Sequence, residues 1–244
     1  MLCNVSRQFV DKVVRQAKPA EKTEERTLGS FRFLPHVAWS IDFAQVKFNG
    51  ICRNAALLIE ETSRKKIGIA VSESQTAQVA TRLVEKTIED YGVLPLVLKH
   101  DGGPQFKAEM FQKLLEEKRV VSLPSVFHYP RYNARCERMV RDVKKVMPEK
   151  EEELRREIEL MDNAPRRMLS GKTSSQVFRE TMPEKDFDRE GFIKEVQGRK
   201  QDAGNALAWK GGDAKFQRIA VEETLKKHQL CLFTKGKTLQ IGSG

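Results

Sequence analysis

The sequence predicts an α/β fold in which helices pack on a mixed β-sheet. Three runs with strand character follow one another over residues 39–48, 51–61 and 65–74. The Asn49-Gly50 pair between the first two is a strong hairpin signal, so these runs are expected to form an antiparallel meander. Amphipathic helical runs then alternate with short apolar runs, which is typical of helices that cross over to further strands. The expected order is β-β-β-α-β-α-β-α.

The elements after the meander follow from periodicity and end signals. In residues 75–92, Val79, Leu83 and Ile88 recur at near-helical spacing, and Gly92 is suited to end a helix. Further runs predict strands over 93–100 and 119–125, and helices over 107–118, 133–147 and 149–168. The last of these helices is highly charged, and its narrow apolar stripe consists of Leu154, Ile158 and Met161.

The composition suggests three parts of unequal character. Residues 1–34 form a charged segment with a weak helical pattern and a linker, 35–182 the predicted core, and 183–244 a basic extension. Within that extension, residues 215–244 are interpreted as short strands around a Gly-Lys turn, which would make a small β-rich piece.

Charge and cysteine usage restrict the class of protein. Lys and Arg number 44 against 34 for Asp and Glu, and the net charge of +10 favours a polyanionic partner such as nucleic acid. The four cysteines contain no CxxC pair and the four histidines no HxxxH pair, which argues against a zinc site. No apolar run approaches the length of a membrane span or a signal peptide. We therefore expect a cytoplasmic protein, associated with the nucleoid if its host is a bacterium.

Asp42 lies in the middle of the first predicted strand, between Ile41 and Phe43. A charged side chain there is costly if it points into the core without a partner. The same strand face carries Ser40 and Ala44, so this face is not strongly apolar. Asp42 is therefore either a solvent-facing residue of a half-exposed strand or a functional carboxylate.

Asp101 follows the apolar run 96–98 and precedes Gly102 and Gly103. Asp before Gly is common in turns, so one interpretation is a simple turn at the end of a strand. The other is a functional carboxylate, because the two glycines remove side chains that would crowd an approaching ligand.

Glu137 shares one face of the predicted helix 133–147 with Arg141, Lys144 and Lys145. This face is either solvated, with a Glu–Arg pair, or an acidic ligand beside basic side chains. Considered jointly, two aspartates at strand positions and one glutamate on a later helix can converge at one edge of a sheet. Such an oxygen cluster suits Mg²⁺, and two ions roughly 3.5–4 Å apart support in-line displacement at phosphorus.

Three motifs in order resemble the DDE transposase and retroviral integrase family, whose catalytic core has a ribonuclease-H-like fold. They are WSIDFAQV (39–46), LKHDGGPQF (98–106) and FHYPRYNARCERMVRDVKK (127–145). The spacing from Asp101 to Glu137 is also typical of that family. A later stretch, LSGKTSSQVF (169–178), resembles the segment that follows the core in bacterial insertion-sequence members, so the similarity covers roughly residues 36–180.

The resemblance implies a polynucleotidyl transferase that acts in DNA recombination. Asp42, Asp101 and Glu137 would form its catalytic triad and bind two Mg²⁺ or Mn²⁺ ions, with Asp42 shared between them. Its partners would be double-stranded DNA, as transposon ends and target, and further copies of the chain, at least as a dimer. The implied DNA-binding residues are Lys144, Arg141, Lys145, Asn133, Arg131 and Arg138.

The sequence also departs from the family pattern. His100 stands where Ser or Thr is usual, Ala134 replaces a Gly, and Arg131 replaces a common Gln. Residues 1–34 carry neither a zinc-binding set nor a complete helix-turn-helix. Recognition of element ends is therefore expected from another chain, from the product of an upstream reading frame, or from the C-terminal extension.

Two other functions fit the same residues. One is a catalytically inactive, transposase-derived remnant that binds DNA, and the other is a ribonuclease-H-like nuclease that only hydrolyses. In every case no protein nucleophile is required, so Cys136 is interpreted as a packing residue beside Glu137.

Overall fold

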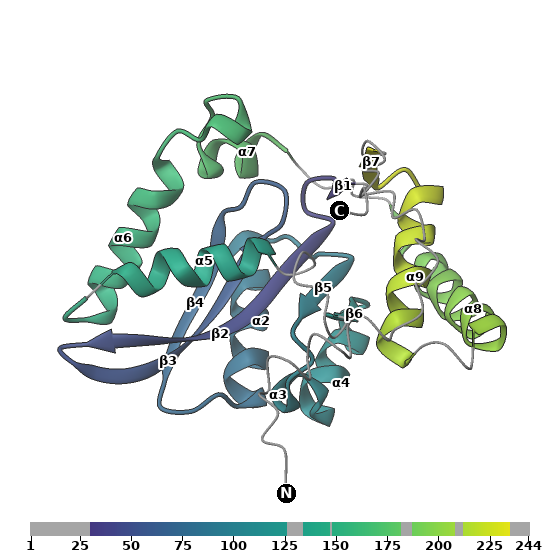
Figure 1. Cartoon of the computed structure of the whole chain (residues 1–244), viewed down its shortest axis with the longest axis horizontal. Helices are drawn as coiled ribbons and strands as arrows, with labels where there is room; N and C mark the ends of the chain where they lie inside the picture. Colours follow the sequence, from purple (N-terminus) through teal and green to yellow (C-terminus); the bar gives the residue numbers. More distant parts are fainter. Residues whose placement is uncertain (1–29, 126–133, 147, 182–186, 208–211, 235–244) are drawn as a thin grey trace, which may run out of the picture. The chain divides into compact units, whose positions relative to one another are not determined.

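The computed structural model describes residues 30–125, 134–146, 148–181, 187–207 and 212–234 (Figure 1). The helix predicted near the N-terminus and the strands predicted after residue 234 lie outside these ranges. Residues Arg32–Leu232 form one compact unit, which contains the sheet and the predicted site.

A five-stranded mixed sheet with the strand order β4-β3-β2-β5-β6 is the centre of this unit (Figure 1). The predicted meander is confirmed, because β2 pairs antiparallel with β3, and β3 with β4. Asn49 and Gly50, with φ of 45° and 81°, make the tight turn between β2 and β3. The strands are β2 (Ala38–Phe48), β3 (Ile51–Glu60), β4 (Lys66–Ser72), β5 (Val97–His100) and β6 (Val121–Pro124).

The short apolar strands β5 and β6 continue the sheet in the parallel sense. Strand β5 pairs directly with β2, in a register that sets Ala38 opposite Val97 and Ser40 opposite Lys99. Parallel pairing requires a crossover, which α2 provides between β4 and β5. The carboxyl ends of β2 and β5 consequently point in the same direction.

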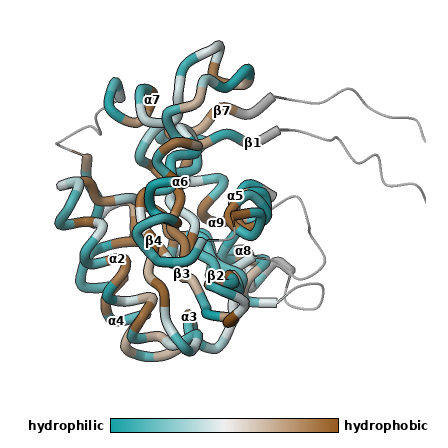
Figure 2. The backbone as a smooth tube through the Cα atoms, turned by 90° about the vertical axis from the view of Figure 1, so that its left-hand side faces the viewer, coloured by the Kyte–Doolittle hydropathy of each residue, from teal (hydrophilic) through white to brown (hydrophobic). Residues whose placement is uncertain are grey.

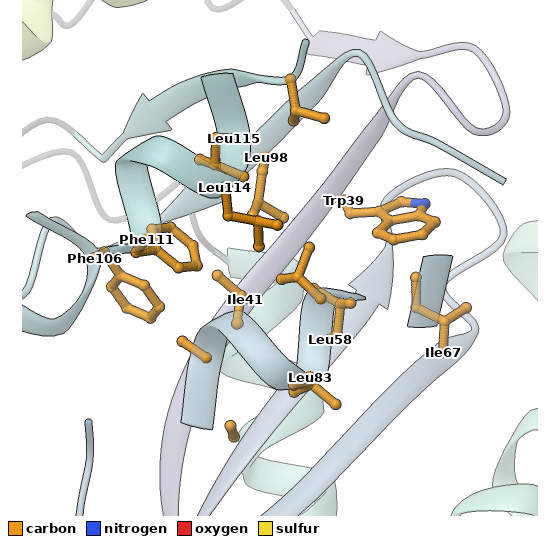
Figure 3. Packing of buried hydrophobic residues seen from close by; sticks show 14 of the residues in the cluster. Trp39, Ile41, Leu58, Ile67, Leu83, Leu98, Phe106, Phe111, Leu114 and Leu115 are labelled. Carbon is orange, nitrogen blue, oxygen red and sulfur yellow. The ribbon is translucent and has the colours of Figure 1, made fainter. Parts of the chain in front are cut away.

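Helices α2 (Ala77–Tyr91), α3 (Pro104–Lys107) and α4 (Glu109–Glu117) cover one face of the sheet. Helix α2 begins at Thr76, whose hydroxyl accepts a hydrogen bond from the Val79 amide, and it ends at Gly92 in the left-handed conformation. The odd-numbered residues Trp39, Ile41 and Phe43 of β2 face these helices. Figure 3 shows Trp39 and Ile41 packed among side chains of the strands and helices, such as Leu98 and Phe111.

Helices α5 (Ala134–Lys145) and α6 (Glu151–Asn163) cover the opposite face, where the even-numbered residues of β2 lie. In Figure 2, α6 is largely hydrophilic along its length. Its buried positions are Leu154, Ile158 and Asp162, so the third position of the predicted stripe is Asp162 and not Met161. The reason is an ion pair: Lys66 Nζ lies 2.9 Å from Asp162 Oδ1, and both side chains are almost fully buried.

The C-terminal extension is mainly helical, and the strands expected over residues 215–227 are absent. Helices α8 (Arg189–Leu207) and α9 (Asp213–Lys227) pack on each other, and Gly204 of α8 lies against the ring of Phe216. Glu195 of α8 also pairs with Lys227 at 3.0 Å. These tertiary contacts stabilise helices that lack a strong apolar stripe. The remaining elements are β1 (Ser30–Phe33), which pairs with β7 (Cys231–Thr234), the 3-10 turn η2 (Arg167–Leu169) and α7 (Ser174–Glu180).

Among the helices of the described ranges, none is both long and apolar enough to cross a lipid bilayer. The boundaries suggested at residues 34/35 and 182/183 stay a prediction. Helix α9 does contact the sheet of the same compact unit, because Gln217 donates a hydrogen bond of 3.1 Å to the Ser122 carbonyl on β6.

His100, the unusual residue before Asp101, is a buried core residue at the end of β5. Its ring packs against Phe106 and Phe111, with centroid distances of 5.1 and 6.2 Å. Its Nδ1 accepts a hydrogen bond from the Gly102 amide, and its Nε2 lies 3.0 Å from the Ser122 hydroxyl. Both ring nitrogens are thus used by a neutral imidazole, which connects β6 to the turn that carries Asp101.

Because His100 is buried as a neutral ring, the protein should lose stability in mild acid. Burial, reinforced by Lys107, lowers the pKa of His100 from 6.5 to about 4. The unfolded chain therefore takes up this proton first, and stability is lost as the pH falls from about 6.5 toward 4. The full loss from this group is on the order of 3 kcal/mol. Urea unfolding should show a smaller loss between pH 7 and pH 4.5 for His100→Thr than for the wild type. Equal losses would contradict this role of the ring.

Candidate active site

The two predicted aspartates lie at corresponding places on neighbouring parallel strands. Asp42 and Asp101 each lie two residues beyond Ser40 and Lys99, which are paired across β2 and β5. Alternation along the strands places Ser40, Asp42 and Lys99 on the face that α5 covers. Asp42 is half-buried within the long strand β2, whereas Asp101 is exposed just after β5 ends.

The electrostatics of Asp42 indicate that the three predicted carboxylates are neighbours. The pKa of Asp42 is raised to about 6, chiefly by burial and in addition by the negative charges of Asp101 and Glu137. Two groups oppose the rise: the Phe43 amide, which donates a hydrogen bond of 2.8 Å to Asp42 Oδ1, and the ammonium group of Lys144. Asp42 thus interacts with one carboxylate from β5 and one from α5.

Glu137 is brought to this place by the way α5 packs on the sheet. Cys136, Met139 and Val143 recur at helical spacing, are almost fully buried, and pack on the residues of β2, β3 and β4 that face this side. Glu137 itself is exposed in the first turn of the helix. The amphipathic pattern of α5 therefore fixes which side of the helix is buried, and Glu137 remains open to solvent near Asp42.

The structure at Asp101 is compatible with both interpretations that its sequence context allowed. Asp101 Oδ1 accepts a hydrogen bond of 2.8 Å from the Gly103 amide, which closes a local turn. Gly102 has a φ of 78°, a left-handed conformation that favours glycine. The turn leaves the carboxylate exposed at the strand end, so the turn and a ligand-binding role are compatible.

In the described part of the chain, no three His, Cys, Asp or Glu side chains already enclose a point where a metal ion could sit. The triad is a set of neighbouring carboxylates and not a closed cage. Its donor chemistry nevertheless fits a hard divalent cation, since carboxylate oxygens are the preferred ligands of Mg²⁺ and Mn²⁺. A cation would also relieve the repulsion that helps to raise the pKa of Asp42.

Helix α5 also carries exposed basic side chains. Arg138, Arg141, Lys144 and Lys145 are all exposed, and Lys144 is close enough to Asp42 to influence its pKa. Two of the predicted DNA-binding residues, Arg131 and Asn133, lie outside the described residues. The predicted positive surface thus stays a prediction, and among its residues on α5 Lys144 lies near Asp42.

The structure adds two arginines that the sequence did not single out. Arg64, in the turn after β3, and Arg166, after α6, line a small hollow together with Arg135 and Arg138 of α5. Burial, and then the repulsion of these three other arginines, lowers the pKa of Arg64 to about 10. Arg64 and Arg166 are about a hundred positions apart in sequence, so no local pattern could have predicted their meeting.

A second unpredicted feature is a buried network of polar side chains centred on Glu61. This carboxylate accepts hydrogen bonds from Ser40, Lys99 and Arg135, which belong to β2, β5 and α5. The only sequence signal for it was an acidic residue directly after an apolar strand. In contrast, the expectation for Cys136 is confirmed: it is fully buried, and burial raises the pKa of its thiol, which disfavours a nucleophilic role.

Comparison with known proteins agrees with this arrangement. Residues 34–129 match the family model of the integrase core domain, a range that includes Asp42 and Asp101 and ends before Glu137. A search of curated protein sequences gave no match.

Solved structures share the fold at low sequence identity. One is a chain of the simian T-cell lymphotropic virus intasome, solved in complex with PP2A regulatory subunit B56 gamma, with 16% identity and a TM-score of 0.57. The alignment covers 66% of the present chain and 63% of that chain. Another is the HTLV-2 integrase catalytic core domain in complex with magnesium, in its trimeric form, with 16% identity and a TM-score of 0.51. It covers 60% of the present chain and 99% of that domain.

The dimeric form of the same HTLV-2 domain, also in complex with magnesium, has 17% identity and a TM-score of 0.50 over 59% of the present chain and 97% of that domain. The mixed five-stranded sheet with its flanking helices is accordingly a ribonuclease-H-like fold. The match to the integrase core domain model is thus confined to residues 34–129, and the chain has the fold of retroviral integrase catalytic cores.

Proposed function

We propose that this chain is a DNA transposase or integrase that uses Asp42, Asp101 and Glu137 to catalyse metal-dependent phosphoryl transfer. The observation that carries the proposal is the proximity of Asp42 on β2 to two other carboxylates, Asp101 just after the neighbouring parallel strand β5 and Glu137 on α5. The family match and the magnesium-bound HTLV-2 relatives support it.

The reaction has two steps of the same type. In the first, water attacks a phosphodiester at the element end, the bond from phosphorus to the 3′ oxygen breaks, and a free 3′-hydroxyl remains. In the second, this hydroxyl attacks a target phosphodiester, a new bond to phosphorus forms, and the target 3′ oxygen leaves. No covalent enzyme intermediate is needed, which is consistent with the burial of the Cys136 thiol.

The three carboxylates would hold two Mg²⁺ or Mn²⁺ ions, with Asp42 contacting both. When bound, such ions supply Lewis-acid stabilisation of the attacking and leaving oxygens. Half-burial of Asp42 limits water around the site, whereas exposed Asp101 and Glu137 leave room for a DNA strand. Phe43 orients Asp42 through its amide, and the Gly103 amide orients Asp101.

The basic face of α5 would bind the DNA backbone next to the triad. Arg138, Arg141, Lys144 and Lys145 are exposed on this helix, while Arg64 and Arg166 line a hollow with Arg135 and Arg138 on the flank of α5 away from Glu137. Such contacts neutralise phosphates and position the strand without reading its sequence. Joining two element ends to a target requires at least two active sites, so we propose that the chain works on DNA as a dimer or a larger oligomer.

Removal of any one triad carboxylate should abolish the chemistry while the fold remains intact. We expect Asp42→Asn, Asp101→Asn and Glu137→Gln each to lower Mn²⁺-dependent strand transfer by about a hundredfold or more. The assay is the joining of a labelled element end to target DNA. Asp90→Asn, at an exposed position on α2, is the matched control and should retain activity.

The same assay separates the alternative functions. Full activity of Glu137→Gln would refute the triad. Hydrolysis without joined product would favour a nuclease, and wild-type protein that is neither active nor stabilised by Mn²⁺ against thermal unfolding would favour an inert remnant.

Binding of Mn²⁺ should weaken steeply in mild acid. The pKa of Asp42 is raised to about 6, so below this pH the carboxyl group carries a proton that the cation must displace. The apparent Kd for Mn²⁺ should then rise about tenfold for each pH unit below 6 and stay nearly constant above pH 7. Calorimetric titrations at pH 5 and 7 measure the change, and equal Kd values at the two pH values would contradict the role of Asp42.

Loss of a basic side chain from α5 should weaken DNA binding in a salt-dependent way. For Lys144→Gln or Arg141→Gln, the plot of log K against log salt should become shallower by about one unit. Affinity should fall similarly for unrelated DNA sequences, because the contact is to phosphate. Fluorescence anisotropy over a salt series measures this slope. Lys86→Gln on α2 is the control, and an unchanged slope for both α5 variants would count against this surface.

A further inference from the structure

The buried network around Glu61 connects the three elements that carry the predicted triad. Glu61 directly follows β3 and is only 1% exposed. Its Oε1 accepts hydrogen bonds from Lys99 Nζ, at 2.8 Å, and from the Ser40 hydroxyl. Its Oε2 accepts one from an Arg135 guanidinium nitrogen, also at 2.8 Å. One carboxylate therefore binds β5 and β2 through one oxygen and α5 through the other.

Each of the three donors is placed in a fixed relation to the triad. Every donor lies two positions before a triad residue of the same element. The three pairs are Ser40 and Asp42 on β2, Lys99 and Asp101 at the end of β5, and Arg135 and Glu137 on α5. In a strand this offset returns to the same face, so on β2 the network and Asp42 share the face that α5 covers.

On α5, a separation of two residues places the side chains on different sides of the helix. Successive helical residues are rotated by about 100°, so Arg135 and Glu137 lie on opposite flanks of the residue between them. That residue, Cys136, is fully buried against the sheet. In the first turn of α5, Arg135 and Glu137 therefore lie on either side of the buried Cys136. Arg135 is hydrogen-bonded to Glu61, and Glu137 lies near Asp42.

Arg135 makes the directional contacts between α5 and the sheet. Of the α5 side chains that the structure describes, only Arg135 forms hydrogen bonds with another element: to Glu61 Oε2, and at 2.9 Å to the Glu61 carbonyl oxygen. The remaining packing is apolar, through residues such as Cys136, Met139 and Val143. Apolar contacts are non-directional, so they leave the slide and rotation of a helix less well defined than a paired guanidinium does.

We propose that Glu61 is a positioning residue, which fixes the first turn of α5, and with it Glu137, against the strands that carry Asp42 and Asp101. This inference rests on the proposed function, since it assigns Glu61 the task of holding a metal-binding triad in place. Glu61 does not touch substrate or metal, and it acts through Arg135, Lys99 and Ser40. A buried ion pair with a purely structural role, like Lys66–Asp162 between β4 and α6, is the natural comparison.

The test compares variants of the full chain in two measurements. Arg135→Gln removes the ion pair between α5 and Glu61 but leaves the Glu61–Lys99 pair intact. It is therefore less disruptive than Glu61→Gln, which leaves Lys99 and Arg135 without their carboxylate. Arg135→Lys keeps the charge and serves as the conservative variant. Asp162→Asn is the matched control, because it breaks a buried ion pair on the same face of the sheet without touching the network.

The first measurement is amide hydrogen exchange in metal-free buffer. We expect faster exchange at the amides of the second turn of α5, which donate to the carbonyls of the first turn, for Arg135→Gln than for the wild type, with α2 unchanged, and no such change in α5 for Asp162→Asn. This measurement is independent of metal binding. Unchanged protection of α5 in both Arg135→Gln and Glu61→Gln would overturn the inference even if the protein is an active recombinase.

The second measurement is the Kd for Mn²⁺ by calorimetry. Arg135→Gln should raise the Kd about tenfold or more, as is usual when the support of a ligand is lost, and Arg135→Lys should restore most of the affinity. Asp162→Asn should lower the thermal midpoint but leave the Kd within about twofold of the wild type. An equal rise in Kd for Asp162→Asn and Arg135→Gln would reduce Glu61 to a general stabilising role. Wild-type protein that binds no Mn²⁺ would instead contradict the proposed function, while hydrogen exchange still decides whether Glu61 positions α5.

Discussion

The parallel pairing of β2 with β5 is the constraint from which the arrangement of the site follows. It joins the antiparallel meander to the two parallel strands and sets Ser40 beside Lys99 at the middle of the sheet. Two residues beyond this pair, β2 carries Asp42, and Asp101 follows the end of β5. Helix α5 packs on the face of β2 on which Asp42 lies. A shift of this register by one residue would turn one aspartate into the opposite core, among Trp39 and the aromatic residues of α3 and α4.

Opposing influences set the charge state of Asp42 beside this pairing. Burial and the negative charges of Asp101 and Glu137 raise its pKa, whereas the Phe43 amide and Lys144 lower it, which leaves Asp42 with a pKa of about 6. A divalent cation would complete the balance of charge, and the exposed basic residues of α5 would then meet the phosphates of DNA.

Local patterns predicted much of this structure from the sequence. The Asn49-Gly50 hairpin, α2 with its terminal Gly92, and the order of strands and helices from β2 to α5 were all predicted from such patterns. The ribonuclease-H-like fold was implied by the resemblance of three motifs to the integrase family. Helices α8 and α9 were missed because tertiary contacts such as Glu195 with Lys227 stabilise them. The Glu61 network, the Arg64 hollow and the role of His100 depend on residues that are distant in sequence. No period or spacing reveals such partners.

The decisive evidence would be the position of bound Mn²⁺ in crystals of the full chain, located by anomalous scattering at the manganese edge. If the present interpretation of the site is correct, the signal will lie between the carboxylates of Asp42, Asp101 and Glu137, and Arg135 will still contact Glu61. A signal elsewhere on the protein, or none at the triad in crystals that contain ample Mn²⁺, would contradict it.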